Sequence, residues 1–112
     1  MTSFRQGDVV LVRFVFTDES GEKRRPALIL SSDDYQHSRQ EVIIAAITSN
    51  VQRLLVGDQS IADWRAAGLL FPSVATGVIR TVKQSMLDRR LGSLTPTDLG
   101  AVQQELAHAL GL

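Results

Sequence analysis

The sequence contains no cysteine, and only two of its 112 residues are histidines. The lack of cysteine excludes a disulfide framework, a zinc knuckle and a thiol nucleophile. With His37 and His108 as the only imidazoles, we expect no histidine-built metal site, and we predict no cofactor. The longest apolar runs, such as 42–47, are far shorter than the ~20 residues that span a bilayer, and the first residues lack the apolar stretch of a signal peptide. We therefore expect a cytoplasmic protein with no membrane partner.

The chain also lacks net charge, because twelve Lys and Arg residues balance twelve Asp and Glu residues. This balance excludes a polybasic nucleic-acid tail and an acidic decoy, but it leaves room for a local basic patch. The basic residues are ten Arg and two Lys. A planar guanidinium binds phosphate through two parallel hydrogen bonds, so the bias suits a nucleic-acid partner. A coding bias of the source genome is the simpler explanation, and composition alone does not decide the function.

Several short apolar segments are typical of β-strands in a single domain that covers residues 1–112. They are the segments 9–16, 27–30, 42–47, 51–56 and 78–82. The polar stretches 17–24 and 31–40 are interpreted as loops, and they are too short to hold the helical crossovers of a parallel sheet. The sequence therefore predicts a mainly β (α+β) domain, built as a curved antiparallel sheet or small barrel.

Two helices are predicted to accompany the sheet. A short inserted helix is expected over 61–67, because it starts with capping-box spacing and ends at Gly68. A second, amphipathic helix begins after the N-cap Thr95 and ends at Gly111. Its apolar residues recur at spacings of three and four, at Leu99, Val102, Leu106 and Leu110.

Polar clusters stand at the ends of three predicted strands, where loops place side chains in solvent beside a rigid scaffold. They are Lys23-Arg24-Arg25, Thr48-Ser49-Asn50 and Arg80-Thr81. If the second and third strands pair as a hairpin, Arg25 falls near Thr48. A guanidinium beside hydroxyl and amide groups can hold a phosphodiester and stabilise charge on it. Each cluster also has a structural explanation: a solvated hairpin shoulder, a strand terminus, and an arginine paired with a carboxylate in the sheet.

Other catalytic patterns are missing from the sequence. No nucleophile-elbow motif accompanies either histidine, and no Gly-rich phosphate loop is present. Trp64 is interpreted as an anchor that packs the short helix onto the sheet. The arginine and threonine clusters therefore remain the candidates for chemistry.

The order of these segments resembles the PemK/MazF family of toxins. Gly7-Asp8-Val9-Val10 is similar to the opening of the family, and the segment 24–31, Arg-Arg-Pro-Ala-Leu-Ile-Leu-Ser, to its second strand. The segment 42–49 resembles the third strand, and 79–82 begins a similar carboxyl-terminal half. The similarity keeps its order and spacing over nearly the whole chain. It implies a small SH3-like barrel with a terminal helix, assembled as a homodimer.

The resemblance also implies an activity. Many family members are metal-independent endoribonucleases, the toxins of type II toxin–antitoxin systems, each neutralised by a cognate antitoxin. The active-site arginine before proline matches Arg25, and the threonine that ends the third strand matches Thr48. The family cleaves single-stranded RNA through the 2′-hydroxyl, which leaves a 2′,3′-cyclic phosphate and a 5′-hydroxyl. The remaining cluster residues are then expected to bind RNA: Lys23, Arg24, Ser49, Asn50, Arg80 and Thr81.

The chain departs from many active relatives in two places. Thr76-Gly77-Val78 stands where they carry an acidic residue or glutamine, and the segment 58–72 differs from the best-known members. The alternative function is therefore a non-catalytic SH3-like binding module, either a degenerate toxin or a gyrase inhibitor of the CcdB type. The gyrase type depends on the end of the terminal helix, where residues 109–112 contain no aromatic wedge.

Overall fold

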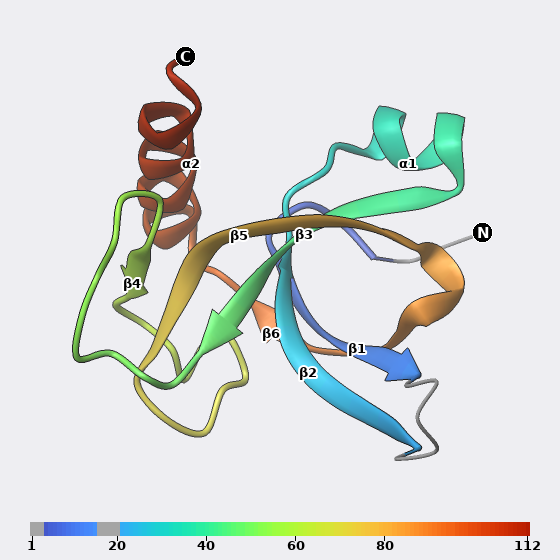
Figure 1. Ribbon diagram of the computed structural model, residues 1–112, viewed down its shortest axis with the longest axis horizontal. Helices are drawn as coiled ribbons and strands as arrows, with labels where there is room; N and C mark the ends of the chain where they lie inside the picture. Colours follow the sequence, from blue (N-terminus) through green and yellow to red (C-terminus); the bar gives the residue numbers. More distant parts are fainter. Residues whose placement is uncertain (1–3, 16–20) are drawn as a thin grey trace.

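The computed structural model describes residues 4–15 and 21–112. Six strands form one antiparallel sheet in the order β4-β5-β3-β2-β1-β6, and the sheet curls into a half-barrel (Figure 1). The elements are β1 (Asp8–Val15), β2 (Glu22–Ile29), α1 (Asp33–Arg39), β3 (Glu41–Thr48), β4 (Gln59–Ile61), β5 (Ser73–Lys83), the 3-10 turn η1 (Gln84–Met86), β6 (Leu87–Ser93) and α2 (Pro96–Leu110). The predicted mainly β class is confirmed.

The sheet separates two hydrophobic cores, and the central strands supply side chains to both. In β1, Val9 belongs to the core beneath α2, whereas Val10 and Val12 belong to the core inside the curl. A strand that is buried on both faces has a nearly continuous apolar sequence instead of an alternating one. Burial on both faces of β1 therefore explains the apolar run that begins at Val9.

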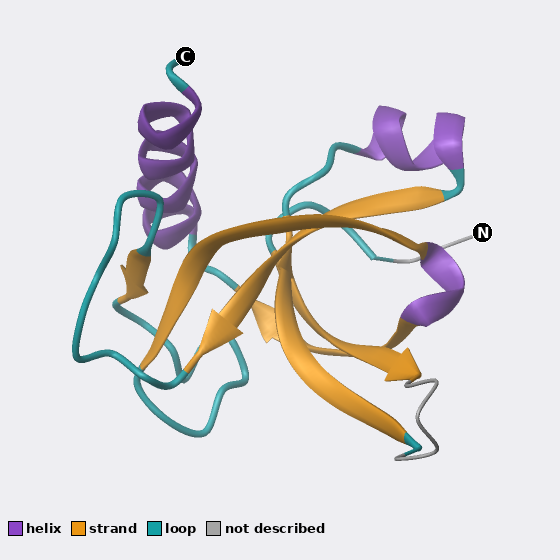
Figure 2. Cartoon of the chain, in the orientation of Figure 1, coloured by secondary structure: helices purple, strands orange, loops and turns teal. Residues whose placement is uncertain are grey.

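Helix α2 begins and ends where the sequence predicts. The Thr95 Oγ1 accepts a hydrogen bond from the Asp98 amide at 3.1 Å, and Gly111 ends the helix with φ of 73°. Val102 and Leu106 are buried against the sheet, but Leu110 is 61% exposed, so the apolar stripe packs over only part of its length. The helix stands at one end of the sheet, beside β4 and β5 (Figure 2).

The predicted loop 31–40 is wrong, because this segment contains α1. The Ser32 Oγ caps the helix by accepting from the Tyr35 amide at 3.2 Å. Gln36 is the buried residue of this helix, and its side-chain amide donates to the Phe4 carbonyl at 3.0 Å. A short helix attached through one polar side chain has no apolar stripe, so hydrophobic periodicity cannot reveal it.

The predicted short helix at 61–67 is also wrong, because Ile61 ends β4 and residues 62–67 form successive turns. The buried carboxylate of Asp98 accepts from the amides of Ala62 at 3.0 Å and Asp63 at 2.9 Å. Gly68 closes the segment with φ of 77°, and a Cβ there would lie 2.1 Å from the Leu91 carbonyl oxygen. The sequence signals for caps and glycine stops were real, but they belong to turns.

The strand boundaries need further corrections. The segment 51–56 forms no strand, and the short strand β4 follows it instead. Strand β5 is longer than the predicted 78–82, and β6 was not predicted at all. The predicted loop 17–24 lies outside the described residues at 17–20, while its residues 22–24 belong to β2.

Within the described part of the chain, no helix has both the length and the apolar character needed to cross a membrane.

Candidate active site

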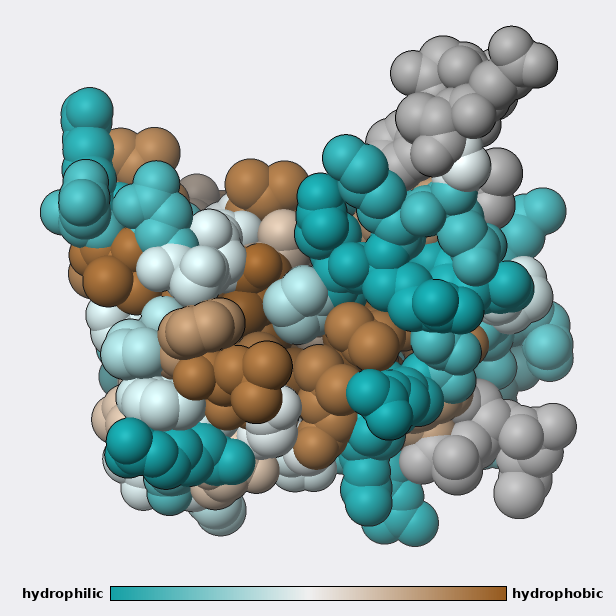
Figure 3. All heavy atoms as spheres, turned by 90° about the horizontal axis from the view of Figure 1, so that it is seen from below, coloured by the Kyte–Doolittle hydropathy of each residue, from teal (hydrophilic) through white to brown (hydrophobic). Residues whose placement is uncertain are grey.

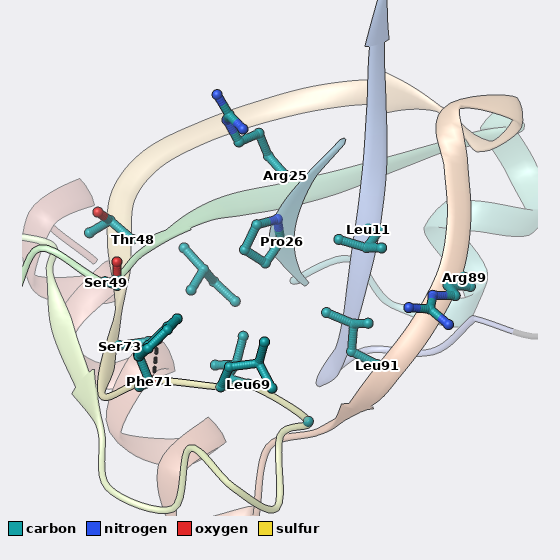
Figure 4. A pocket seen from close by; sticks show the side chains of 13 residues that line it. Leu11, Arg25, Pro26, Thr48, Ser49, Leu69, Phe71, Ser73, Arg89 and Leu91 are labelled. Carbon is teal, nitrogen blue, oxygen red and sulfur yellow. Dashed lines mark hydrogen bonds between the residues drawn. The ribbon is translucent and has the colours of Figure 1, made fainter. Parts of the chain in front are cut away.

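The pairing of β2 with β3 brings the two main candidate residues together. Ala27 pairs with Ala46 in an antiparallel register, and this is the last pair of the two strands. Beyond it, Arg25 of β2 and Thr48 of β3 lie toward the same end of the sheet. Both residues line one cleft of about 610 Å³. Figure 4 shows Thr48 and the neighbouring Ser49 at one side of this cleft and Arg25 above it.

The floor and walls of this cleft are mostly apolar. The lining residues come from five strands and from loops, mainly the loop before β5. The apolar ones include Leu11, Pro26, Ile47, Leu69, Phe71 and Leu91. Phe71 is 64% exposed. Hydrophobic side chains gather at the centre of the face shown in Figure 3, between hydrophilic regions. An apolar hollow with a few polar groups at its edge is typical of a ligand site.

Arg25 lies between this cleft and a second one. The second cleft has a volume of about 320 Å³ and is lined by Arg25 and Arg80 among others. The Arg80 guanidinium lies over the Phe14 ring, 5.0 Å from its centre. Among the described residues, none is an ion-pair or hydrogen-bond partner of the Arg25 side chain. Its positive charge is therefore available to a ligand in either cleft.

The Thr48 hydroxyl is oriented by the backbone that follows it. Its Oγ1 accepts a hydrogen bond from the Asn50 amide at 3.1 Å, and the Asn50 Oδ1 accepts in turn from the Gln52 amide at 3.4 Å. Because the oxygen is already an acceptor, its hydrogen is left to donate to a ligand. Asn50 thus shapes the turn that carries Thr48, and it does not line either cleft.

The other predicted RNA-binding residues on β2 and β5 do not all lie on the same side of the sheet as Arg25. Lys23 is exposed and lies on the same side of β2 as Arg25, opposite Phe14 of β1. Arg24 projects from the other side, where its Nε lies 2.7 Å from an Asp88 carboxylate oxygen. Thr81 pairs with Ile43, and strand alternation turns it away from the face of Arg80. The structure therefore does not bring Arg24 and Thr81 to the site.

Comparison with known protein families identifies the relatives of this chain. The family model of PemK-like, MazF-like toxins of type II toxin–antitoxin systems matches residues 5–110. The chain belongs to this toxin family. Among curated proteins, none is significantly similar to it.

Solved structures of other toxins share the fold of this family member. The Mycobacterium tuberculosis toxin MazF-mt6 is 25% identical, with a TM-score of 0.76 over 94% of this chain and 97% of its own. A mycobacterial endoribonuclease, solved in complex with its cognate antitoxin, is 23% identical, with a TM-score of 0.76 over 98% of this chain and 97% of its own. A chain of the MazE-MazF structure from Deinococcus radiodurans is 19% identical, with a TM-score of 0.81 over 100% of this chain and 99% of its own.

The departure of this toxin-family chain at 76–78 is a β-bulge in β5. The β3–β5 register shifts between Ala45 and Ile47. The Thr76 hydroxyl there donates to the Ala46 carbonyl at 2.8 Å and accepts from the Val78 amide at 3.2 Å. An Asp58 carboxylate oxygen accepts from the Gly77 amide at 2.9 Å. The Thr76 hydroxyl and the amides of Gly77 and Val78 thus form hydrogen bonds within the chain.

Sequence reasoning missed one charged residue of the cleft, Arg89 of β6. It lines the cleft together with Arg25, and Figure 4 shows it on the wall opposite Thr48 and Ser49. The signal was the charged run Asp88-Arg89-Arg90, which could be read only after β6 had been recognised as a strand. Phe71 was missed because it belongs to a loop without a motif.

Proposed function

We propose that this toxin-family protein is a metal-independent endoribonuclease that cleaves single-stranded RNA, including messenger RNA. One observation carries the proposal: Arg25, whose side chain has no ion-pair or hydrogen-bond partner among the described residues, lines the same cleft as the oriented hydroxyl of Thr48. Family membership supports it, as do similar structures described as endoribonucleases. We assign catalysis to Arg25 and Thr48, and further RNA contacts to Lys23, Ser49 and Arg80.

In the proposed reaction, the 2′-hydroxyl of the RNA attacks the adjacent phosphorus. A P–O2′ bond forms and the P–O5′ bond breaks, which gives a 2′,3′-cyclic phosphate and a 5′-hydroxyl. One proton leaves the 2′-oxygen and one reaches the 5′-oxygen. The Arg25 guanidinium, which keeps its proton, stabilises the negative charge that grows on the phosphate oxygens. Thr48 donates its hydroxyl hydrogen to one of these oxygens.

The proposal includes the assembly and the regulation of the protein. We expect it to act as a homodimer in the cytoplasm and to be neutralised by a cognate antitoxin. Similar structures include a toxin solved with its cognate antitoxin and a MazE-MazF structure. An acidic segment of an antitoxin would place carboxylates against Arg25 and Arg80, and its affinity should fall as the salt concentration rises.

A second candidate function is that of a non-catalytic binding module, either a degenerate toxin or a gyrase inhibitor of the CcdB type. The bulge favours the degenerate toxin, because the Thr76 hydroxyl is occupied by hydrogen bonds to the backbone. The gyrase type finds less support, since Leu110 and Leu112 are the exposed apolar residues at the end of α2 and neither is aromatic.

One experiment separates these functions. Purified protein is incubated with a long RNA in EDTA, and the new ends are mapped and chemically identified. The proposal expects 2′,3′-cyclic phosphate and 5′-hydroxyl ends that are lost in Arg25→Ala. Binding of the RNA without any cleavage, with or without divalent cations, would instead establish the binding module.

A further inference from the structure

The arginines of β2 and β6 differ in how their charge is compensated. Arg24 is paired with Asp88 at 2.7 Å, and Arg90 lies 3.7 Å from an Asp8 carboxylate oxygen. Among the described residues, none is an ion-pair or hydrogen-bond partner of the Arg25 or Arg89 side chains. Only the latter two of these four line the cleft of about 610 Å³. Of these four arginines, the two without a partner are therefore the two at this cleft.

Arg89 and Arg25 stand at different places around an apolar floor. Arg89 pairs with Leu11 across β6 and β1, and Leu11 pairs with Pro26 across β1 and β2. This row of residues forms part of the floor, and two interstrand spacings separate β6 from β2, about 10 Å. Figure 4 shows the Arg89 side chain reaching toward the cleft from the wall opposite Thr48 and Ser49.

The space between these charges suits one nucleotide of a single strand. A volume of about 610 Å³ falls in the range of about 300–1,000 Å³ that is usual for small-ligand sites. The exposed ring of Phe71 and the side chains of Leu69 and Leu91 line the same space. Single-stranded nucleic acid is bound where bases contact aromatic or apolar side chains and cations follow the backbone.

We infer that Arg89 is an RNA-binding residue that holds a neighbouring phosphate of the strand whose scissile phosphate lies at Arg25. It positions the substrate and takes no part in the bond changes. This inference rests on the proposed function, since it takes RNA as the ligand and Arg25 as the site of cleavage.

The test measures binding of a single-stranded RNA that cannot be cleaved, a fluorescent 2′-O-methyl oligonucleotide, by anisotropy at several KCl concentrations. In Arg89→Ala, affinity should fall about tenfold. The slope of log K against log[KCl] should become shallower by about 0.7, the value for one lost phosphate contact. Arg89→Lys should keep the slope. The matched control is Arg90→Ala on the same strand, which should keep both slope and affinity, with thermal melting to verify that each variant is folded.

Cleavage kinetics give a second measurement. Arg89→Ala should raise KM and leave kcat within about twofold, because the lost contact is equally strong in the ground state and the transition state. If Arg89→Ala fails to fold, Arg89→Gln compared with Arg89→Lys makes the same test.

The outcomes distinguish the inference from the proposed function. If the wild type cleaves RNA but Arg89→Ala binds with unchanged slope and affinity, the inference is overturned and the function stands. If the wild type binds RNA without cleaving it and Arg89→Ala shows the shallower slope, the function fails and the RNA contact stands. A loss of affinity for polyglutamate but not for RNA would assign Arg89 to an acidic protein partner and overturn the inference.

Discussion

Replacing Arg25 by alanine tests the chemistry of the cleft with little disturbance of the fold. Arg25 is exposed near the middle of β2, and its side chain has no ion-pair or hydrogen-bond partner among the described residues. Its cross-strand neighbour Val12 is fully buried and stays in place. Truncation therefore removes charge and no core volume, so the free energy of unfolding should fall by less than ~1 kcal/mol.

The same substitution should reduce RNA cleavage by about 10²–10³-fold, the usual loss when a preorganised donor to a developing negative charge is removed. This factor corresponds to about 2.7–4 kcal/mol of transition-state stabilisation. Arg25→Lys should recover only part of the rate, because a single ammonium group cannot donate two parallel hydrogen bonds to a phosphate.

The assay follows the initial rate of cleavage of a long RNA in EDTA, together with thermal melting of each variant. Arg13→Ala is the matched control: Arg13 lies on the neighbouring strand, contacts Glu22 at 3.7 Å and lines neither cleft. It should cut at the wild-type rate. If Arg25→Ala melts near the wild-type temperature and also cuts at the wild-type rate, the catalytic role is assigned to the wrong residue, and the binding module becomes the better hypothesis.

Four further predictions concern the site, the fold and the assembly. Thr48→Ala should lower the cleavage rate by about fivefold, less than Arg25→Ala, because a neutral hydroxyl forms a weaker hydrogen bond than a guanidinium; Thr48→Ser should keep most of the rate in the same assay. Gly68→Ala should lower the free energy of unfolding in urea by at least about 2 kcal/mol, since φ is 77° and the new Cβ would lie 2.1 Å from the Leu91 carbonyl. Asp98→Ala should cost about 2–4 kcal/mol in thermal melting, because two backbone amides lose their acceptor. Light scattering should give a mass near twice the 12.3 kDa of one chain, and a clean monomer at micromolar concentration would contradict the proposed homodimer.

The parts of the fold that the sequence predicts well are those that local patterns determine. The apolar run from Val9 predicts β1 because both faces of that strand are buried. Thr95 and Gly111 predict the ends of α2 because a helix terminus needs local acceptors and a left-handed residue. Each of these signals is contained within the element that it describes.

The two errors about the short helices have one physical origin. Capping chemistry occurs wherever backbone amides need an acceptor, in turns as well as in helices. The predicted helix 61–67 has this chemistry, but the amides of Ala62 and Asp63 are bound by Asp98 of α2, and residues 62–67 form turns. Helix α1 has it too, at Ser32, yet its single buried side chain is the polar Gln36. Capping signals alone therefore do not separate a turn from a short helix, and a helix without an apolar stripe gives no periodic signal.

In the candidate site, too, residues on strands that are consecutive in the sequence could be predicted, and residues on a distant strand could not. Arg25 and Thr48 could be placed together from the sequence because β2 and β3 follow one another, and their antiparallel register fixes which residues face each other. The position of β6 could not be predicted in this way. β6 is a highly charged strand at the edge of the sheet, where it pairs with β1. Its charged residues protect the edge from aggregation, but they also interrupt the apolar pattern by which a strand is recognised in the sequence. This strand decides two assignments at once. Its Asp88 neutralises Arg24, which the sequence analysis assigned to RNA, and its Arg89, which the sequence analysis did not assign, lines the cleft.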